Sequence, residues 1–319
     1  SSGNTDGKLT INKKDLTISN ITANNKTYDG TTTATLSNIG TLVGLVTGED
    51  LVLNNPTSVI FSSKDVGDGI DVTASGYTIA DKNSFKASNY NLLDTSKTTT
   101  ANISKASLTA TLNDNSKIYD GTSYSGGNGI TFNGFVNGET ASLLGGNLVY
   151  SGTSQGAKDA GNYIISGSGL TSNNYNISFV DGKLTINKKD LTISNITANN
   201  KTYDGTTTAT LSNIGTLVGL VTGEDLVLNN PTSVIFSSKD VGDGIDVTAS
   251  GYTIADKNSF KASNYNLLDT SKTTTANIVA SVNPTPNPTP NPTPTPTPTP
   301  NPTPNPTPTD NNQKPKVDE

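Results

Sequence analysis

Residues 6–103 recur without a single difference as residues 181–278, so 98 consecutive positions are repeated at an offset of 175. A third unit lies between the two copies and shares with them the string Lys-x-Tyr-Asp-Gly-Thr, whose tyrosines are Tyr28, Tyr119 and Tyr203. The steps between these tyrosines, 91 and 84 residues, are far longer than one rung of a solenoid and are typical of a module that closes its own core. The sequence therefore predicts a linear array of three modules, the first and third identical.

Five strings occur in the same order in all three units, although the middle unit differs from the others at most other positions. They are Ile-x-Lys-x-x-Leu-Thr at Ile11, Ile103 and Ile186; Lys-x-Tyr-Asp-Gly-Thr at Lys26, Lys117 and Lys201; Val-x-Gly-Glu at Val46, Val136 and Val221; Lys-Asp-x-Gly at Lys64, Lys158 and Lys239; and Asn-Tyr-Asn-(Leu/Ile) at Asn89, Asn174 and Asn264. Their persistence in a diverged unit indicates that they determine structure. The first string is predicted to be a strand that carries the chain from one module directly into the next.

These strings divide the chain into five parts. Because "TDGKLTINKKDLT" at the start matches "VDGKLTINKKDLT" at the end of the middle unit, the first ten residues are expected to be the tail of a preceding module. The predicted parts are residues 1–10 as that tail, 11–103, 104–185 and 186–278 as modules, and 279–319 as a linker with a polar end.

The composition of the segments between the shared strings predicts an all-β fold. Short runs such as "LVLN", "SVIFSS" and "DVTASGYTIA" are rich in Val, Ile, Thr and Tyr and are bounded by Gly, Asn and Asp, which is typical of strands and turns. Asp-Gly and Asn-Gly pairs supply the positive φ that tight turns need. We expect small β-sandwich or β-grasp-like modules arranged head to tail.

A proline-rich tract follows the last module. Residues 283–308 place Pro at every even position, and alternate prolines cannot join a helix or a sheet. The tract is predicted to adopt polyproline II, at roughly 3.1 Å per residue, as a semi-rigid spacer about 80 Å long.

Composition excludes several functions. The chain contains no Cys, His, Met or Trp, and all 21 basic residues are Lys, so thiolate nucleophiles, imidazole bases and ordinary zinc sites are excluded. A net charge of -6 and the absence of Arg argue against nucleic acid as a partner. No apolar run is long enough to span a membrane. The sequence predicts neither enzymatic activity nor a cofactor.

Through these shared strings, the modules resemble the YDG family of bacterial surface proteins. The resemblance is carried by "KTYDGT" from Lys26, "VTGED" from Val46, "DKNSF" from Asp81 and "NYNL" from Asn89, while the middle unit is closer to related MBG-type modules. It implies tandem extracellular modules of large adhesins of the filamentous-haemagglutinin, two-partner-secretion type, active in adhesion or biofilm. The family supplies no catalytic residues.

Two groups of residues are candidate sites. The triplet Asp65, Asp68 and Asp71, repeated as Asp240, Asp243 and Asp246, offers clustered oxygens to Ca²⁺, although a glycine-rich turn between strands explains the same spacing.

The second group is formed by the Tyr-Asp pairs Tyr28 and Asp29, Tyr119 and Asp120, and Tyr203 and Asp204. Such a tyrosine can stack on a sugar ring while the carboxylate accepts hydroxyl hydrogen bonds. The alternative is structural, with the tyrosine packed into the module and Asp-Gly forming a turn. The adjacent carboxylates Glu49 and Asp50 do not have the geometry of a glycosidase pair.

Two functions fit these patterns. The first is a monomeric, extended stalk on the bacterial surface, since identical copies are useful where length is the product. The second is a multivalent binder of host or matrix glycans or proteins, in which tandem copies raise avidity.

Overall fold

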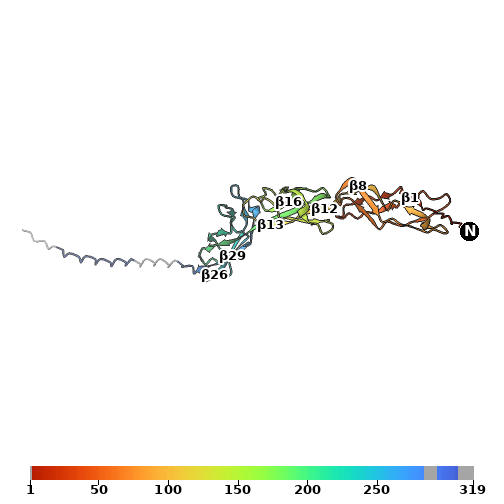
Figure 1. Cartoon of the computed structure of the whole chain (residues 1–319). Coiled ribbons are helices and arrows are strands. Elements are labelled where there is room, and N and C mark those ends of the chain that lie inside the picture. Colours follow the sequence, from red (N-terminus) through yellow and green to blue (C-terminus); the bar gives the residue numbers. More distant parts are fainter. Residues whose placement is uncertain (1, 284–292, 308–319) are drawn as a thin grey trace, which may run out of the picture.

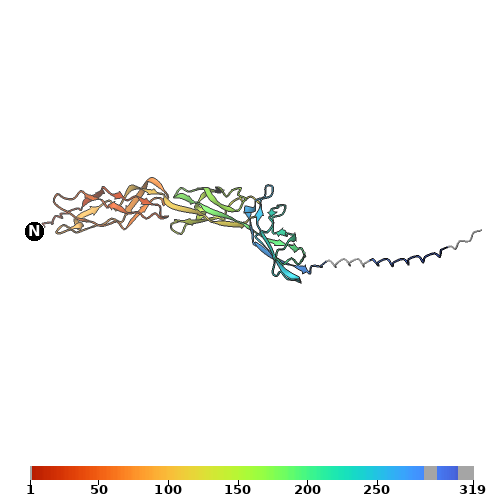
Figure 2. The ribbon, with the colours of Figure 1, turned by 180° about the vertical axis from the view of Figure 1, so that it is seen from behind.

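The computed structural model describes residues 2–283 and 293–307 and shows three β-rich modules that lie end to end. The first two modules lie in line and the third is turned at an angle to them, as both views show (Figures 1 and 2). Among the described residues there are strands and three short 3-10 helices and no α-helix. The prediction of an all-β array of small modules is confirmed.

The first module spans β1 to β11. Its elements are β1 (Lys14–Ser19), β2 (Thr22–Ala23), β3 (Lys26–Thr27), β4 (Leu36–Asn38), β5 (Thr41–Val43), β6 (Val52–Leu53), β7 (Ser58–Phe61), β8 (Gly67–Ser75), β9 (Ile79–Ala80), η1 (Ala87–Asn89), β10 (Tyr90–Leu92) and β11 (Ser96–Ser104).

The second module has fewer and longer strands. They are β12 (Ala106–Leu112), β13 (Asn115–Ile118), β14 (Ile130–Asn133), β15 (Gly145–Ser151), β16 (Gly161–Thr171), β17 (Tyr175–Val180) and β18 (Gly182–Asn187), with η2 (Ala141–Leu143) before β15.

The third module repeats the elements of the first. They are β19 (Lys189–Ser194), β20 (Thr197–Ala198), β21 (Lys201–Thr202), β22 (Leu211–Asn213), β23 (Thr216–Val218), β24 (Val227–Leu228), β25 (Ser233–Phe236), β26 (Gly242–Ser250), β27 (Ile254–Ala255), η3 (Ala262–Asn264), β28 (Tyr265–Leu267) and β29 (Ser271–Val279).

Each module has one three-stranded and one four-stranded sheet, and the first and third modules each add two two-stranded sheets, β2-β4 with β6-β9 and β20-β22 with β24-β27. The strand orders are β10-β1-β5 and β3-β11-β8-β7 in the first module, β14-β12-β17 and β13-β18-β16-β15 in the second, and β23-β19-β28 and β21-β29-β26-β25 in the third. The core lies between the two sheets: Ile18 of β1 packs in one cluster with Ala74 of β8 and with Tyr77. Strand β1 alternates buried Leu16 and Ile18 with exposed Thr17, as a strand with one buried face must.

The chain passes between modules with one residue outside the strands. β11 ends at Ser104 and β12 begins at Ala106, and β18 and β19 are likewise separated only by Lys188. The strands predicted at Ile103–Thr109 and Ile186–Thr192 are therefore each two strands, because the chain leaves one sheet and joins the next at this lysine. The strand predicted from Ile11 begins at Lys14. Direct passage leaves no linker between modules.

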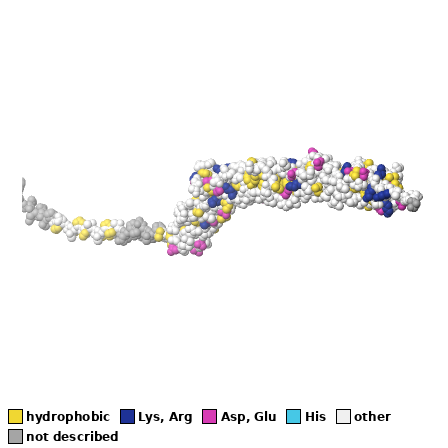
Figure 3. Space-filling model, viewed as in Figure 1, with side chains coloured by type: hydrophobic (Ala, Val, Ile, Leu, Met, Phe, Trp, Pro, Cys, Tyr) yellow, Lys and Arg dark blue, Asp and Glu magenta, His cyan; other side chains and the backbone are white. Residues whose placement is uncertain are grey.

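The proline-rich tract is only partly described. Residues 293–307 are exposed and form neither helix nor strand. The rest of the tract, apart from Asn283, and the polar end from Thr309 lie outside the described residues, so polyproline II remains a prediction for the tract as a whole. No helix in the described part of the chain is long and apolar enough to cross a membrane. Hydrophobic and charged side chains are scattered over a mostly uncharged polar surface (Figure 3).

Candidate functional site: the joints between modules

Four of the five shared strings supply polar contacts where one module meets the next, and the fifth carries the chain across the boundary. At the first boundary, Glu139 of the second module receives two hydroxyl groups: Tyr28 Oη of the first module donates to Glu139 Oε1 at 2.6 Å, and Tyr175 Oη of the second donates to Oε2 at 2.5 Å. We call this contact the first joint; it consists of Tyr28, Gly30, Lys64, Asp65, Asn137, Glu139, Asn174 and Tyr175.

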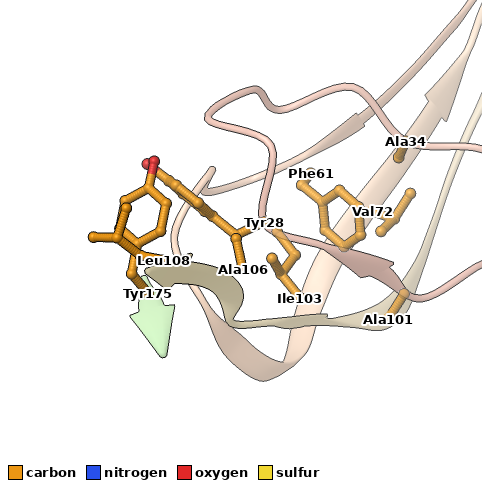
Figure 4. Close-up of a cluster of buried hydrophobic side chains, with 9 residues drawn as sticks. All are labelled: Tyr28, Ala34, Phe61, Val72, Ala101, Ile103, Ala106, Leu108 and Tyr175. Carbon is orange, nitrogen blue, oxygen red and sulfur yellow. The ribbon is translucent and has the colours of Figure 1, made fainter. Parts of the chain in front are cut away.

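A hydrophobic core continues through the first joint. Tyr28 and Ile103 of the first module share one buried cluster with Leu108 and Tyr175 of the second. The rings of Tyr28 and Tyr175 meet edge to face, with centroids 5.4 Å apart and planes at 79°, an arrangement that aromatic quadrupoles favour. Figure 4 shows the two rings at one end of the cluster with their hydroxyl groups turned to the same point. The two modules are thus joined by buried apolar surface as well as by the chain.

The Lys-x-Tyr-Asp-Gly-Thr string forms a braced loop that presents Tyr28. Asp29 Oδ1 accepts hydrogen bonds from the backbone N–H of Thr31 at 2.9 Å and from Lys26 Nζ at 2.8 Å. Lys26 Nζ also donates to the carbonyl oxygens of Thr31 and Thr33. Burial opposes the ionised carboxyl, but the hydrogen bonds from Lys26 and Thr31 outweigh it and lower the pKa of Asp29. The loop therefore keeps its shape without help from the next module.

Gly30 lets the second module approach this loop. Its φ of +76° lies in the left-handed region, and a Cβ there would lie 2.7 Å from Asn137 Cβ across the joint. Asn137 Nδ2 donates to the carbonyl oxygen of Gly30 at 3.2 Å. The glycine of the string is thus required both by the turn and by the contact.

The Val-x-Gly-Glu string is a turn that points Glu139 at the tyrosines. The N–H of Glu139 donates to the carbonyl oxygen of Val136 at 2.9 Å, which closes the turn. Tyr175 Oη accepts the N–H of Val136 at 3.1 Å while it donates to Glu139. Tyr175 therefore fixes both ends of the turn that carries the carboxylate.

A second polar contact runs beside the tyrosines. Asn174 Oδ1 accepts the N–H of Val66 at 3.0 Å, and Asn174 Nδ2 donates to Asp65 Oδ1 at 2.9 Å. One asparagine side chain thus binds both an N–H and a carboxylate of the Lys-Asp-x-Gly string. This pairing fixes the rotation of one module against the other.

The charges in the first joint keep Glu139 ionised. Burial acts to raise the pKa of Glu139, but hydrogen bonds from Tyr175 and Tyr28 and the charge of Lys64 outweigh it, so the pKa is lowered. Lys64 Nζ lies 3.5 Å from Glu139 Oε1 and 3.2 Å from Tyr28 Oη. Burial and the bond to Glu139 raise the pKa of Tyr175 to about 12, so its hydroxyl stays a donor.

The second joint repeats this arrangement with other residues. Tyr119 Oη and Tyr265 Oη donate to the two carboxylate oxygens of Glu224 at 2.8 and 2.5 Å, and the rings meet edge to face at 5.3 Å. Asn264 Oδ1 accepts the N–H of Ala160 at 2.7 Å, and Asn264 Nδ2 donates to Asp159. The second joint consists of Tyr119, Gly121, Asp159, Ala160, Glu224, Lys261, Asn264 and Tyr265.

The two joints differ in which module supplies the lysine that reaches a carboxylate of the other module. At the first joint it is Lys64 of the preceding module. At the second joint, Lys261 Nζ of the third module lies 2.6 Å from Asp159 Oδ2 of the second, and this contact, followed by the bond from Asn264, lowers the pKa of Asp159. Lys86, which holds the same position in the first module, pairs instead with Asp81 of its own module. The lysine of this sequence therefore changes partner when a module precedes it.

Comparison with known families gives two matches along the chain. The YDG domain family matches residues 12–101 and 187–276, which together are more than half of the chain, and the family "MBG domain (YGX type)" matches residues 108–185. The chain belongs to the YDG domain family. The first and third modules are YDG modules, and the second is an MBG module.

Other comparisons add little to this assignment. No curated protein matches the chain. Among solved structures, the chain is similar to the crystal structure of Drosophila N-cadherin EC1-4, at 9% identity and a TM-score of 0.24, with 85% of this chain and 76% of that one covered. A likeness at this TM-score carries no argument about fold or function.

The identical sequences of the YDG modules show what the joint does to its residues. Tyr28 in the first joint is buried, whereas Tyr203, which has the same sequence around it, is 42% exposed. In the first YDG module, Glu49 binds Tyr90 Oη at 2.5 Å beside a surface cavity of about 400 Å³ that Val46 and Asn89 also line. In the third module the same surface holds Tyr119 of the MBG module.

The structure places two of the three predicted Tyr-Asp pairs at the joints, and the third, Tyr203 and Asp204, outside them. Tyr28 and Tyr119 are 2% and 6% exposed, so neither ring has a face open to a sugar. Asp29 and Asp120 brace the loops, and Asp204 does so beside Tyr203. Tyr28 lies in one cluster with Phe61 and Ile103 of its own module, as the structural alternative expects, and the same cluster also includes Tyr175 of the following module.

The predicted calcium triplets are not brought together. Asp65 binds Asn174, Asp68 lies at the start of β8, and Asp71 of β8 pairs with Thr100. No group of three or more acidic side chains that could hold a metal ion occurs in the described part of the chain, which includes the second triplet, Asp240, Asp243 and Asp246.

Sequence reasoning missed the partners of the tyrosines. Glu139 and Glu224 lie in the shared Val-x-Gly-Glu string and Tyr175 and Tyr265 in the shared Asn-Tyr-Asn string, but neither string by itself indicates a contact between modules. One signal was available: a turn needs only Gly, Asn or Asp, so an invariant Glu and Tyr in the diverged MBG module indicate a side-chain contact.

Proposed function

We propose that the array is a rigid spacer of a secreted bacterial surface adhesin and holds adhesive parts away from the cell. The observation that supports this proposal best is the core that runs from Tyr28 into Leu108 with only Lys105 between the strands. Bending at such a joint exposes buried aromatic surface and separates the hydroxyl group of Tyr28 from its acceptor, Glu139. The joint therefore favours one relative orientation of its two modules.

The organisation of the array supports the same role. Each module contacts only its neighbours, so copies add length without disturbing a core elsewhere. Identical YDG copies on both sides of an MBG module increase the length of the array, whereas a single binding pocket does not require a second copy. The proline-rich tract after Val279 extends the spacer by a different means, since alternate prolines resist compaction.

We extend the proposal to two further properties. The modules are non-catalytic, since the chain has no Cys or His and the glutamate and tyrosines of the shared strings form contacts between modules wherever two modules meet. The extracellular location of the protein rests on the resemblance to surface adhesins. In this proposal the array is a monomer that binds no nucleic acid and does not enter the membrane.

The test measures shape. Small-angle scattering and negative-stain microscopy of the whole chain are expected to show an elongated particle that bends at the second joint, with a narrow range of angles between modules. Glu224→Ala leaves the hydroxyl groups of Tyr119 and Tyr265 without their shared acceptor and is expected to widen the angle at the second joint. Glu49→Ala, in the same sequence outside either joint, is the matched control and is expected to leave the angles unchanged.

A broad range of angles in the unaltered chain contradicts the spacer. Saturable binding to a glycan array or to host cells that weakens as modules are removed favours the alternative, a multivalent binder.

A further inference from the structure

In every module, parallel strand pairs join strands near the start of the module to strands near its end. In the MBG module, the entering strand β12 pairs with β17 over six positions, from Ala106 with Tyr175 to Thr111 with Val180. The leaving strand β18 pairs in parallel with β13 over four positions, from Asn115 with Leu184 to Ile118 with Asn187. The N–H of Tyr119 adds a bond to the carbonyl oxygen of Asn187 at 2.8 Å.

The YDG modules have the same arrangement with fewer pairs. β1 pairs in parallel with β10 at three positions, and β3 pairs in parallel with β11 at two. Each pairing is extended by one backbone bond: Leu93 donates to the carbonyl oxygen of Leu16 at 2.9 Å, and Tyr28 donates to that of Ser104 at 2.8 Å. The third module repeats both pairings.

Parallel pairing decides how tension acts on a module. When a chain is pulled at both ends, the entering strand is drawn toward the N-terminus and the C-terminal strands toward the C-terminus. A parallel pair between them must slide, which loads all its hydrogen bonds together. An antiparallel hairpin pulled at its open end, such as β7 with β8, instead opens one pair at a time. The modules therefore resist tension along the chain at the strands where it enters and leaves.

We propose that the array bears tensile load and that its modules yield in a fixed order, the two YDG modules before the MBG module. The proposal rests on the spacer function, since a spacer between a cell and an attached surface is pulled along its length. The order follows from the longer parallel pairings of the MBG module. A yielding YDG module lengthens the chain while the MBG module stays folded.

The extension that each module releases is large. The strands of a YDG module span Lys14–Ser104, 91 residues, and those of the MBG module span Ala106–Asn187, 82 residues. At roughly 3.3–3.6 Å for each extended residue, one YDG module yields about 300 Å of chain. The shorter MBG increment identifies the module that opens in each event.

Single-molecule force spectroscopy of the whole chain, held at its two ends, tests the order. We expect two events of equal force with the longer increment, followed by one event at higher force with the shorter increment. Forced unfolding reports the rate of unfolding along the pulled direction. An MBG event that comes first, or at the force of the YDG events, overturns the proposal.

A change of pulling direction is the control. The chain contains no Cys, so Ser58→Cys with Ser75→Cys places handles only at the open end of β7 and β8, where these residues pair. This direction opens the hairpin pair by pair, and the first module is expected to yield at lower force than when its ends are pulled. Equal unfolding forces in the two pulling directions overturn the proposal that the parallel strand pairs bear the load. Small-angle scattering tests the shape independently of force. If the array is rigid in scattering but its modules unfold at low force, the proposal that the array bears tensile load is wrong and the spacer proposal stands.

Discussion

Tyr28 and Tyr203 have the same sequence around them for dozens of residues, yet Tyr28 is 2% exposed and Tyr203 is 42% exposed. The difference arises from the MBG module, which covers Tyr28 and supplies Glu139 as its acceptor. An exact repeat within one chain thus gives two states of the same residue, one inside a joint and one outside it. This allows the contribution of a joint to be separated from that of the fold.

Tyr28→Ala is expected to weaken the first joint by about 3–5 kcal/mol, as for other large aromatic truncations in a core. The change removes the ring from the shared cluster and leaves Glu139 with one hydroxyl donor fewer. Urea unfolding followed by tyrosine fluorescence measures the loss, since the chain has no Trp.

Tyr203→Ala is the matched control for this change. It alters the same residue in the same sequence but outside either joint, so the cost is expected to be within about 1 kcal/mol. Equal losses at the two positions contradict the role of Tyr28 in joining modules.

High pH is expected to loosen both joints. Burial and the bond to Glu139 raise the pKa of Tyr175 from 10.0 to about 12, and burial and Glu224 do the same for Tyr265. Because the folded state holds these protons more tightly, their contribution is complete below pH 10 and is lost as pH rises toward 12. Denaturant midpoints measured across this range are expected to fall. Tyr175→Phe is expected to flatten this fall, since it removes one of the titrating groups; an unchanged profile contradicts the assignment.

Gly30→Ala is expected to destabilise the first joint more than Gly205→Ala affects the third module. Both glycines have φ near +75°, so both substitutions carry the backbone cost of about 1–2 kcal/mol for a left-handed residue. Only the Cβ at Gly30 also meets a neighbouring module, at 2.7 Å from Asn137 Cβ, whereas that at Gly205 has no atom nearer than 3.9 Å. The difference between the two midpoints in urea therefore measures the clash in the joint. A difference of zero shows that the joint adapts to the extra methyl group.

Much of the fold follows from local patterns in the sequence. The repeat predicts the modules, the alternation of Leu16, Thr17 and Ile18 predicts a strand, and Asp-Gly at Asp29 predicts the turn that the structure shows at Gly30. Each of these signals lies within a few residues of the feature it predicts.

The joints could not be predicted in the same way. Tyr28 and Glu139 are 111 positions apart, and no periodicity links them. Burial of Tyr28 depends on which module follows, so the sequence of its own module is not sufficient to predict it. The same holds for the strand expected from Ile11: without the sheet that Ile186 joins in the MBG module, this segment does not pair before Lys14.

Leu184 and Leu9 provide the last prediction, because both lie in the string "DGKLTINKKDLT". Leu184 of β18 is fully buried in the MBG core, whereas Leu9 is 85% exposed. Leu184→Ala is expected to cost about 2–5 kcal/mol through lost burial and the cavity left behind. Leu9→Ala is expected to change stability by no more than about 0.5 kcal/mol. Thermal or urea unfolding of the two variants measures both, and limited proteolysis is expected to cut the string near Leu9 before the same string near Leu184. Because the residues around the cut are identical, faster cleavage near Leu184 contradicts the placement of β18 within the MBG sheet.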